Sequence, residues 1–482
     1  MRTFVPFSIQ GLIAVGAVTV GAWAQPAPAP GNIEKVYQQS CAACHGMNLE
    51  GGSGSALLGP TWKHGEDSDS LYRVIRDGVP NTAMVGFAAL GDSTIRALAI
   101  YIREKAYAAR SADRPEIAAD PDGRYTSQKH NYQLETVVSG LETPWSIAWL
   151  PDGTSLVTER PGRLRSLDKK GKLSEPISGI PAVFANGQGG LLDVAVHPDY
   201  AKKGNGWIYL AYSDPQTVDG KNVSMTAIVR GRIKAGAWVD QQQIFKAPLE
   251  FYLPTQLHFG CRLVFDQGYL YFGIGERGRM EHAQDLTRPN GKIHRIFDDG
   301  RVPTDNPFAK EPGAFPTLWT YGNRNPQGLV HHPATGEIWE TEHGPRGGDE
   351  VNLIQRGHNY GWPKTSYGMN YNGTPLTSDT TLPGITEPVM YWTPSIGACG
   401  LDVYTGKAFP AWQGNLLAGG LAKQEVHRLV VKDGKVVERE VIFRNHGRVR
   451  DVAVGPDGWV YVVLNAGPNE KGGRVVRLKP TR

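Results

Sequence analysis

A short strand, a turn and a second strand recur six times in this 482-residue chain from residue 148 onwards. The turns contain Pro, Asp, Asn or Gly, the residue types that a reversal between strands requires. Because the units recur at intervals of several tens of residues with no helical pattern between them, radially stacked blades are favoured over a sandwich. The six units begin at Ala148, Val194, Leu263, Leu329, Leu401 and Val452. We predict a mainly β fold, a six-bladed β-propeller, with a solenoid as the structural alternative.

The N-terminal part of the chain shows helical periodicity instead. Ile33, Val36 and Tyr37 follow at helical spacing after Asn32, a residue type that caps helix N-termini. A second apolar stripe at helical spacing closes the region. We therefore predict a small all-α domain over residues 31–106.

Inside this region, Cys41, Cys44 and His45 form the pattern that attaches haem c to a protein. Two thiols at helical spacing add to the haem vinyl groups, and the adjacent histidine binds the iron. A CxxC pair alone also occurs in redox and zinc sites, but no second pair at metal-binding spacing follows in the sequence. The motif therefore predicts a c-type cytochrome domain.

The second axial ligand of the haem iron has to come from farther along the chain. Met84 is the candidate, because the run from Gly78 to Met84 is similar to the Gly-x-Pro-x-Thr-x-Met run of small monohaem c-type cytochromes. A thioether opposite an imidazole raises the haem potential, as an electron acceptor requires. His64 is the rival ligand, and a methionine of the core is the structural alternative.

The first 24 residues have the pattern of a signal peptide. An apolar run from Leu12 to Val20 precedes a small-x-small cleavage site that ends at Ala24. No later segment is apolar enough to cross a membrane. We expect export to the periplasm, removal of residues 1–24, and no transmembrane segment after cleavage.

The segment between the two predicted domains reads as a linker. Residues 107–127 are rich in Ala, Arg, Asp and Pro, include Pro115 and Pro121, and show no periodicity. This assignment leaves residues 128–482 for the propeller.

The charge balance argues against a dedicated nucleic-acid binder. The chain has 51 Lys and Arg against 47 Asp and Glu, and no run of basic residues interleaved with aromatic ones. Cysteine is scarce, and beyond the haem motif only Cys261 and Cys399 occur. The exported compartment permits a disulfide between them, and two buried free thiols are the alternative.

Five strings in the strand-rich part resemble the soluble quinoprotein sugar dehydrogenase family. They are Gly187 to Asp193 with His197-Pro198-Asp199, His258 to Phe265, Tyr321 to Gly328, Glu342 to Glu350, and Asn359 to Pro363. The resemblance runs from about Tyr132 to Leu478, and its closest branch is the PQQ-dependent aldose sugar dehydrogenases of the bacterial periplasm. It implies a propeller that binds PQQ and calcium and oxidises aldose sugars to lactones.

The resemblance also implies catalytic roles. His258 would be the general base that takes the proton from the anomeric hydroxyl of the sugar, and imidazole suits this role because its ordinary pKa is near ~6.5. Arg324 would place a permanent planar charge where negative charge grows during hydride transfer. The glucose-specialised branch carries an acidic residue before the catalytic histidine, whereas Leu257 stands here.

The same resemblance implies a set of residues that hold the three carboxylates and the rings of PQQ. These are Gln188, Asn325, Tyr371, Lys423, Arg448 and Arg450. Arg448 and Arg450 alternate along a predicted strand, so their side chains share a face. A solvated strand edge is the structural alternative for this pair. Lys423 is displaced by one residue from the usual pattern.

The resemblance also implies two calcium sites. The backbone carbonyls of Gly344 and Pro345 would hold an ion that also binds PQQ. Glu350, through its carboxylate, and Tyr360, through its carbonyl, would hold a second, structural calcium. Oxygen ligands suit this hard cation.

The combined pattern predicts a dehydrogenase in which PQQ accepts a hydride from an aldose and single electrons pass to the fused haem c. A soluble cytochrome, a cupredoxin or the respiratory chain would then accept the electrons. A calcium-dependent, lactonase-like hydrolase on the same architecture is the first alternative, because fold alone does not fix chemistry. A non-catalytic binding propeller attached to a cytochrome is the second.

Overall fold

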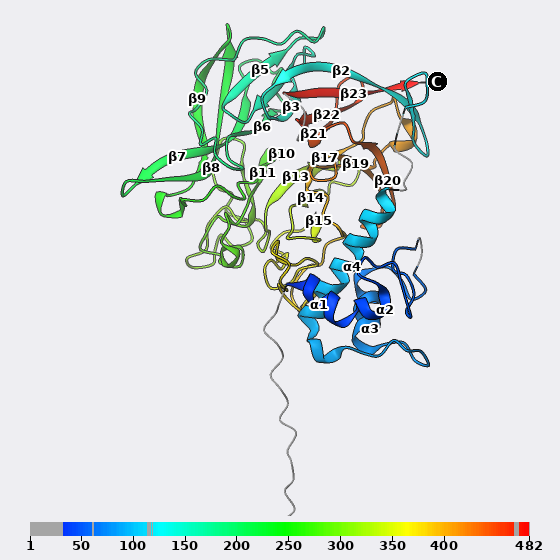
Figure 1. Ribbon diagram of the computed structural model, residues 1–482. Coiled ribbons are helices and arrows are strands. Elements are labelled where there is room, and N and C mark those ends of the chain that lie inside the picture. The colour runs from blue at the N-terminus through cyan, green and yellow to red at the C-terminus, as the bar shows by residue number, and fades with distance from the viewer. Residues whose placement is uncertain (1–31, 60–61, 113–116, 118, 467–471, 482) are drawn as a thin grey trace, which may run out of the picture.

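Two parts with different secondary structure make up the chain: a small helical region and a propeller (Figure 1). The computed structural model describes residues 32–59, 62–112, 117, 119–466 and 472–481. The predicted signal peptide at residues 1–24 lies outside the described residues.

Six sheets form the blades of the propeller, as the six repeats predicted. Blade 1 contains β3 Pro144–Trp149, β4 Ser155–Glu159 and β5 Arg163–Leu167. Blade 2 contains β6 Leu191–Val196, β7 Ile208–Val218, β8 Lys221–Lys234 and β9 Ala237–Lys246. Blade 3 contains β10 Leu263–Asp266, β11 Tyr269–Ile274 and β12 Lys292–Phe297. Blade 4 contains β13 Pro326–His331, β14 Ile338–Glu342, β15 Asp349–Ile354 and β16 Met390–Trp392. Blade 5 contains β17 Ala398–Val403, β18 Leu416–Gly420, β19 Glu425–Lys432 and β20 Lys435–Arg444.

Blade 6 joins the two ends of the strand-rich part and thereby closes the ring. It contains β21 Arg448–Val454, β22 Val460–Asn465 and β23 Gly473–Thr481, together with β1 Arg124–Thr126 and β2 Asn131–Leu141. β2 pairs antiparallel with β23, with Asn131 opposite Thr481. The first strand of each blade contacts the first strands of both neighbouring blades, so β3, β6, β10, β13, β17 and β21 line the centre.

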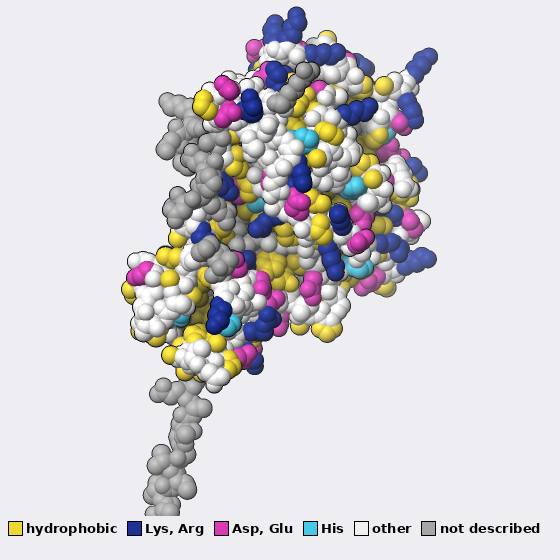
Figure 2. All heavy atoms as spheres, turned by 90° about the vertical axis from the view of Figure 1, so that its right-hand side faces the viewer, with side chains coloured by type: hydrophobic (Ala, Val, Ile, Leu, Met, Phe, Trp, Pro, Cys, Tyr) yellow, Lys and Arg dark blue, Asp and Glu magenta, His cyan; other side chains and the backbone are white. Residues whose placement is uncertain are grey.

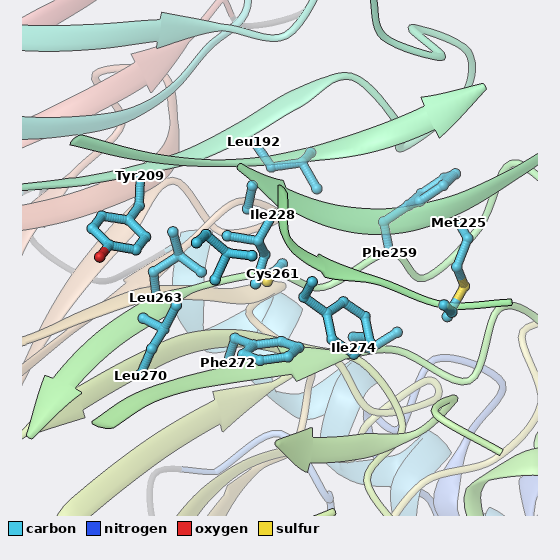
Figure 3. Packing of buried hydrophobic residues seen from close by; sticks show 14 of the residues in the cluster. Leu192, Tyr209, Met225, Ile228, Phe259, Cys261, Leu263, Leu270, Phe272 and Ile274 are labelled. Atoms are coloured by element: carbon cyan, nitrogen blue, oxygen red, sulfur yellow. The ribbon is translucent and has the colours of Figure 1, made fainter. Parts of the chain in front are cut away.

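Apolar side chains fill the space between neighbouring blades. Figure 3 shows Leu192 and Ile228 of blade 2 opposite Leu270 and Phe272 of blade 3, with Cys261 between them. All five side chains are buried. Burial of apolar area between blades supplies the main stabilisation of the ring, because each blade alone exposes two apolar faces.

The helical region contains α1 Ile33–Ser40, α2 Ala42–His45, α3 Ser68–Asp77, the short 3₁₀ helix η1 Ala88–Leu90, and α4 Asp92–Ala112. Asn32 caps α1, since its side chain accepts a hydrogen bond from the backbone N–H of Glu34 at 2.9 Å. Ile33, Tyr37, Leu98 and other apolar residues form one buried cluster. α4 continues into the first residues of the predicted linker, and β1 occupies its last residues.

In the described part of the propeller, three further 3₁₀ helices lie in loops: η2 Leu249–Phe251, η3 Met280–Ala283 and η4 Pro410–Trp412. No helix among the described residues is long and apolar enough to cross a membrane. Acidic and basic side chains are interspersed over the face seen in Figure 2, in keeping with the near-balanced charge of the chain.

Arg262 links several blades at the centre of the propeller. Its guanidinium pairs with Asp193 of blade 2 at 2.8 Å and with Asp451 of blade 6 at 3.1 Å. The same guanidinium donates to Ser146 Oγ of blade 1 at 3.2 Å. All four side chains are buried. Such a network fixes the relative positions of the blades, provided that every charge in it keeps its partner.

Arg262→Met is therefore expected to destabilise the protein by about 3–5 kcal/mol, because it leaves two buried carboxylates unpaired. Urea unfolding followed by tryptophan fluorescence would measure this loss. Arg301→Met is the matched control, since Arg301 pairs with Asp299 at 2.7 Å but is largely exposed; it should change the free energy of unfolding little. Equal stability of the two variants would contradict the structural role of Arg262.

Candidate active site

The candidate residues gather at one end of the propeller because of how its blades are connected. In an antiparallel blade, the start of the first strand and the turn between the second and third strands lie at the same end. Gln188, His258 and Arg324 precede the first strands of blades 2, 3 and 4, and Gly344 lies in the turn between β14 and β15. The long segment between β15 and β16 returns to the same place, since the Tyr371 hydroxyl donates to the Gly344 carbonyl at 3.3 Å.

His258 is buried and held from two sides. Its Nδ1 lies 2.5 Å from Glu276 Oε1, and its backbone N–H donates to Gln188 Oε1 at 2.8 Å. A carboxylate only accepts hydrogen bonds, so Nδ1 carries the hydrogen in the neutral ring and Nε2 keeps its lone pair. His258 also has a φ of +52°, a strained value for a residue with a side chain.

The surroundings of His258 keep its imidazole neutral. Burial lowers the pKa of His258, Glu276 opposes this effect, and the positive charge of Arg324 adds to it. The net direction is downwards. A neutral imidazole with a free Nε2 can accept a proton, so the geometry and the pKa agree with the role of a general base.

Arg324 and Asn325 are fixed by a carboxylate beneath them. Glu342 Oε2 accepts the backbone N–H groups of Arg324 at 2.5 Å and of Asn325 at 3.0 Å. The Arg324 guanidinium donates to the carbonyl of His343 at 2.7 Å and lies 5.1 Å from the ring of Trp362. The side chain of Arg324 is therefore oriented before any ligand binds.

Arg448 and Arg450 share a cavity with a third arginine, Arg160 of the turn after β4. The cavity has a volume of about 340 Å³. Burial, and then the nearby charge of Arg450, lower the pKa values of both Arg160 and Arg448. Mutual repulsion of this kind indicates a site for an anion, because an anion would relieve it. The pair predicted from alternation in β21 therefore lines a cavity rather than a solvated strand edge.

His343 connects this cavity to His258. Arg450, Arg324, His258 and Arg448 all act on its imidazole, and together with burial they hold the pKa of His343 well below its ordinary value. Side chains from blades 3, 4 and 6 thus converge around one half-buried neutral ring.

Three polar atoms at this convergence are buried without a hydrogen-bond partner: Arg324 Nε, Arg450 Nε and Asn325 Nδ2. A buried donor without an acceptor is costly, so an acceptor-rich ligand is expected to complete the site. PQQ, with three carboxylates and two quinone oxygens, offers such acceptors. The residues present therefore fit this cofactor.

Sequence reasoning missed four residues of the site. Glu276 ends the strand-rich string Gly273-Ile274-Gly275-Glu276, and Glu342 and His343 begin one of the resembling strings. The sequence shows these residue types, but it does not show their contacts with His258 and Arg324. Arg160 had no signal of its own, because a lone arginine after a strand is usually solvated.

The carbonyl groups of the predicted calcium residues Gly344 and Pro345 both accept hydrogen bonds. Gly344 O accepts from Tyr371, and Pro345 O accepts from Gly348 N–H at 3.0 Å and from Ser395 Oγ at 3.1 Å. Gly344 is required sterically, since a Cβ there would lie 1.6 Å from the carbonyl oxygen of Gly348. An oxygen-only donor set of this kind fits calcium.

The second predicted calcium position lies beside a group of carboxylates. The Asn352 amide donates to Glu340 at 3.0 Å and to Glu350 at 3.4 Å. Burial, with Glu342 adding its negative charge, raises the pKa of Glu350 well above its ordinary value. Tyr360 packs nearby, and its pKa is raised by burial and by Glu340 and Glu342. Among the described residues, no group of three or more His, Cys, Asp or Glu side chains could hold a metal ion, so backbone oxygens would have to supply most of the ligands.

Lys423 takes a different position from the other predicted PQQ contacts. Its Nζ lies 4.9 Å from the ring of Tyr107, on α4 of the helical region. This lysine thus lies against the helical region.

The haem-attachment residues have the donor chemistry that the motif requires. Cys41 and Cys44 are free thiols, and Cys44 is exposed. His45 Nδ1 lies 2.8 Å from the carbonyl of Ser55, an arrangement that fixes the ring and leaves Nε2 for iron. Met84 is half-buried in a turn closed by Val79 N–H to Met84 O at 2.9 Å, whereas His64 is exposed. These residues fit haem c.

Cys261 and Cys399 are both free and buried. The free-thiol alternative is therefore correct, and the disulfide alternative is wrong. Cys399 Sγ donates to the carbonyl of Arg450 at 2.8 Å, and Arg450 Nη1 lies 3.5 Å from the same sulfur. This thiol helps to orient the arginine.

Comparison with known proteins divides the chain at the same place as the structure. Residues 141–477 match the model of the glucose/sorbosone dehydrogenase family, and residues 28–102 match that of the cbb3-type cytochrome c oxidase subunit III family. The chain is 41% identical over 354 residues to the aldose sugar dehydrogenase YliI of Escherichia coli K12, covering 72% of this chain and 92% of that protein.

Solved structures agree. The apo-form crystal structure of the soluble aldose sugar dehydrogenase from Escherichia coli has a TM-score of 0.67 and 39% identity, over 73% of this chain and all of that one. The PQQ-bound form of the aldose sugar dehydrogenase from Streptomyces coelicolor has a TM-score of 0.59 and 27% identity, over 73% of this chain and 98% of that one.

Proposed function

Because this chain belongs to the glucose/sorbosone dehydrogenase family and carries a fused cytochrome c domain, we propose that it oxidises aldose sugars to lactones in the periplasm with PQQ and calcium, and passes the electrons to its own haem c. One observation carries the proposal. A neutral His258, held by Glu276, lies near Arg324, and the Nε atoms of Arg324 and Arg450 are buried without an acceptor. PQQ, when bound, accepts the hydride that the sugar loses.

The protein's own residues would do the rest of the chemistry. His258 Nε2 takes the proton from the anomeric hydroxyl, and Glu276 stabilises the imidazolium that forms. Arg324 stabilises the negative charge that develops beside it. Arg160, Arg448 and Arg450 would bind the carboxylates of the cofactor.

Two further sets of residues would complete the holoenzyme. Gly344 and Pro345 would hold a calcium ion at the cofactor, while Glu350 and Tyr360 would hold a structural one. Cys41 and Cys44 would carry the haem, with His45 and Met84 as its axial ligands.

The path from the site to the haem supports electron transfer within the chain. The N–H of Ile33, at the start of α1, donates to the carbonyl of Gly373 at 2.8 Å, close to Tyr371. α1 has eight residues and ends directly before Cys41. At 1.5 Å per residue the helix spans about 12 Å, so Cys41 lies about one helix length from this contact with the propeller.

The hydrolase and the binding propeller are less well supported. A hydrolase has no need of a cluster of neighbouring arginines, and a binding protein has no need of a neutral histidine buried beside a carboxylate. The test is reconstitution. Apoprotein treated with a chelator and given PQQ and an aldose should reduce its haem only after calcium is added. Equal reduction after verified removal of calcium would contradict the metal requirement, and no reduction under any condition would contradict the proposal as a whole.

The proposed base makes a prediction about pH. Turnover should fall as the pH drops through the lowered pKa of His258, because protonation removes the lone pair of Nε2. Glu276→Gln removes the charge that raises this pKa, so the acid limb of kcat/KM should move to lower pH. Glu281→Gln is the control, since Glu281 is exposed and lies next to His282. An acid limb that stays in place, or moves to higher pH, would exclude Glu276 as the partner of the base.

A further inference from the structure

We propose that Glu104 of α4 is a positioning residue for the cofactor site: through its ion pair with Arg346, it holds the calcium-binding turn, residues 344–347, against the helical region. This inference rests on the proposed function, because that function makes Gly344 and Pro345 ligands of calcium. It adds a role for the helical region, which would form one wall of the site as well as carry the haem.

The ion pair has both charges close and partly buried. Glu104 Oε2 accepts from Arg346 Nε at 2.8 Å and lies 2.7 Å from Arg346 Nη2. The side chains are 15% and 33% exposed. Arg346 directly follows Pro345, so a restraint on its guanidinium also restrains the carbonyl groups next to it. A planar guanidinium held by two nitrogens has little rotational freedom.

The backbone of Arg346 joins two segments of the propeller. Its N–H donates to Met369 O at 3.0 Å, and Met369 N–H donates to Arg346 O at 2.9 Å. Met369 is fully buried, and it belongs to the apolar cluster of the helical region, not to a blade. The turn is thus anchored in the core of the helical region at two neighbouring points.

α4 also packs directly on the turn. A Cβ on Gly347 would lie only 2.6 Å from Cγ2 of Ile100. Gly347 itself has a positive φ of 85°, so the residue type is required both by the backbone and by the helix that covers it. Ile100 and Glu104 are one helical turn apart and face the same segment.

Four more contacts of the helical region lie at or near predicted cofactor residues. Asn32 Nδ2 donates to Asn372 O at 3.2 Å, and Ile33 N–H donates to Gly373 O, so the segment after Tyr371 is also held by the helical region. Farther along α4, Tyr107 lies under Lys423 and donates to Glu425 Oε1 at 3.4 Å. Figure 1 shows α4 extending from the other helices towards β19 and β20.

Loss of the ion pair should therefore weaken calcium binding without removing any ligand. Residues that orient metal ligands typically change metal affinity by about 10–100-fold when they are replaced. We expect Glu104→Gln in the full-length apoprotein to raise the calcium concentration needed for half-maximal PQQ binding by about tenfold. Saturating calcium should restore the binding of PQQ, because the ligands are intact.

Three other variants complete the design. Lys105→Gln is the matched control, since Lys105 neighbours Glu104 on α4 but only reaches Glu34 at 3.9 Å with both side chains half-exposed; its calcium dependence should equal that of the wild type. Arg346→Lys keeps the charge but loses the planar fork, so it should show a smaller shift than Glu104→Gln. The double variant Glu104→Arg with Arg346→Glu restores the pair in reverse and should recover much of the affinity.

Hydrogen exchange gives a readout that is independent of the cofactor. The amides of Ile33 and Arg346 should exchange faster in Glu104→Gln than in Lys105→Gln, because the contact between the helical region and the turn is loosened. If the wild type binds calcium and PQQ and Glu104→Gln has the same calcium dependence, this inference is overturned and the proposed function stands. A wild type that binds neither would overturn both.

Discussion

His258→Ala is expected to lower the turnover of aldose sugars by about 100-fold or more while the protein still binds PQQ. The loss follows from the geometry, because Nε2 of His258 is the proposed proton acceptor. Glu276 orients the ring, and burial together with the charge of Arg324 lowers its pKa. The measurement is steady-state oxidation with an artificial dye, which makes the result independent of the haem. PQQ binding is measured separately, by titration of the apoprotein.

His358→Ala is the matched control for this prediction. His358 is exposed, and its Nδ1 lies 2.7 Å from Thr386 Oγ1. Turnover in this variant should stay near that of the wild type. If His258→Ala binds PQQ and turns over at a similar rate, a different group accepts the proton and the assignment of the base is wrong.

The sequence predicted the propeller because its signals are local. Each repeat contains the first two strands of one blade and the turn between them, so alternation and turn residues were enough. The same holds for α1, whose cap at Asn32 is four residues from Val36, about one turn of helix. The sequence predicted that the blades form a closed ring, but not which strands close it. That β2 pairs with β23 depends on contacts between opposite ends of the propeller.

The site was predictable by residue type, and its contacts were not. His258 and Glu276 are separated by β10 and β11, and no local pattern says that these strands bring them within 2.5 Å. Arg160 and Arg450 line one cavity although they come from the first and the last blade, at opposite ends of the propeller sequence. Such contacts depend on how the blades close, which a reading of local periodicity does not contain.

The segment between the domains shows a different kind of error. Proline and small residues indicated a linker from residue 107, but α4 continues to Ala112. The helix continues because Ala, Arg and Tyr are tolerated in helices, and because Tyr107 packs against Lys423 and Glu425 of blade 5. From composition alone, a helix that packs on a second domain is predicted to be a flexible linker, since the residues it packs against are distant in sequence.

This docking leads to the second prediction with a large expected effect: electrons from the sugar reach the haem of the same molecule. The helical region contacts the propeller at Ile33, Glu104 and Tyr107, so the two centres are held together and need no collision. With PQQ loaded and sugar saturating, the first-order rate of haem reduction should stay constant when the enzyme is diluted about 100-fold.

Two full-length variants supply the comparison for this dilution experiment. His258→Ala is expected to keep the haem but to lose most sugar oxidation, and Cys41→Ser with Cys44→Ser is expected to oxidise sugar but to attach no haem. In a mixture of the two, haem reduction requires an encounter between molecules, so its rate should fall about 100-fold on the same dilution. Using whole chains matters because Met369 of the propeller lies in the core of the helical region, so separated domains would each lose part of that core. If the wild type slows on dilution as the mixture does, the haem is reduced by another molecule and transfer within the chain is excluded.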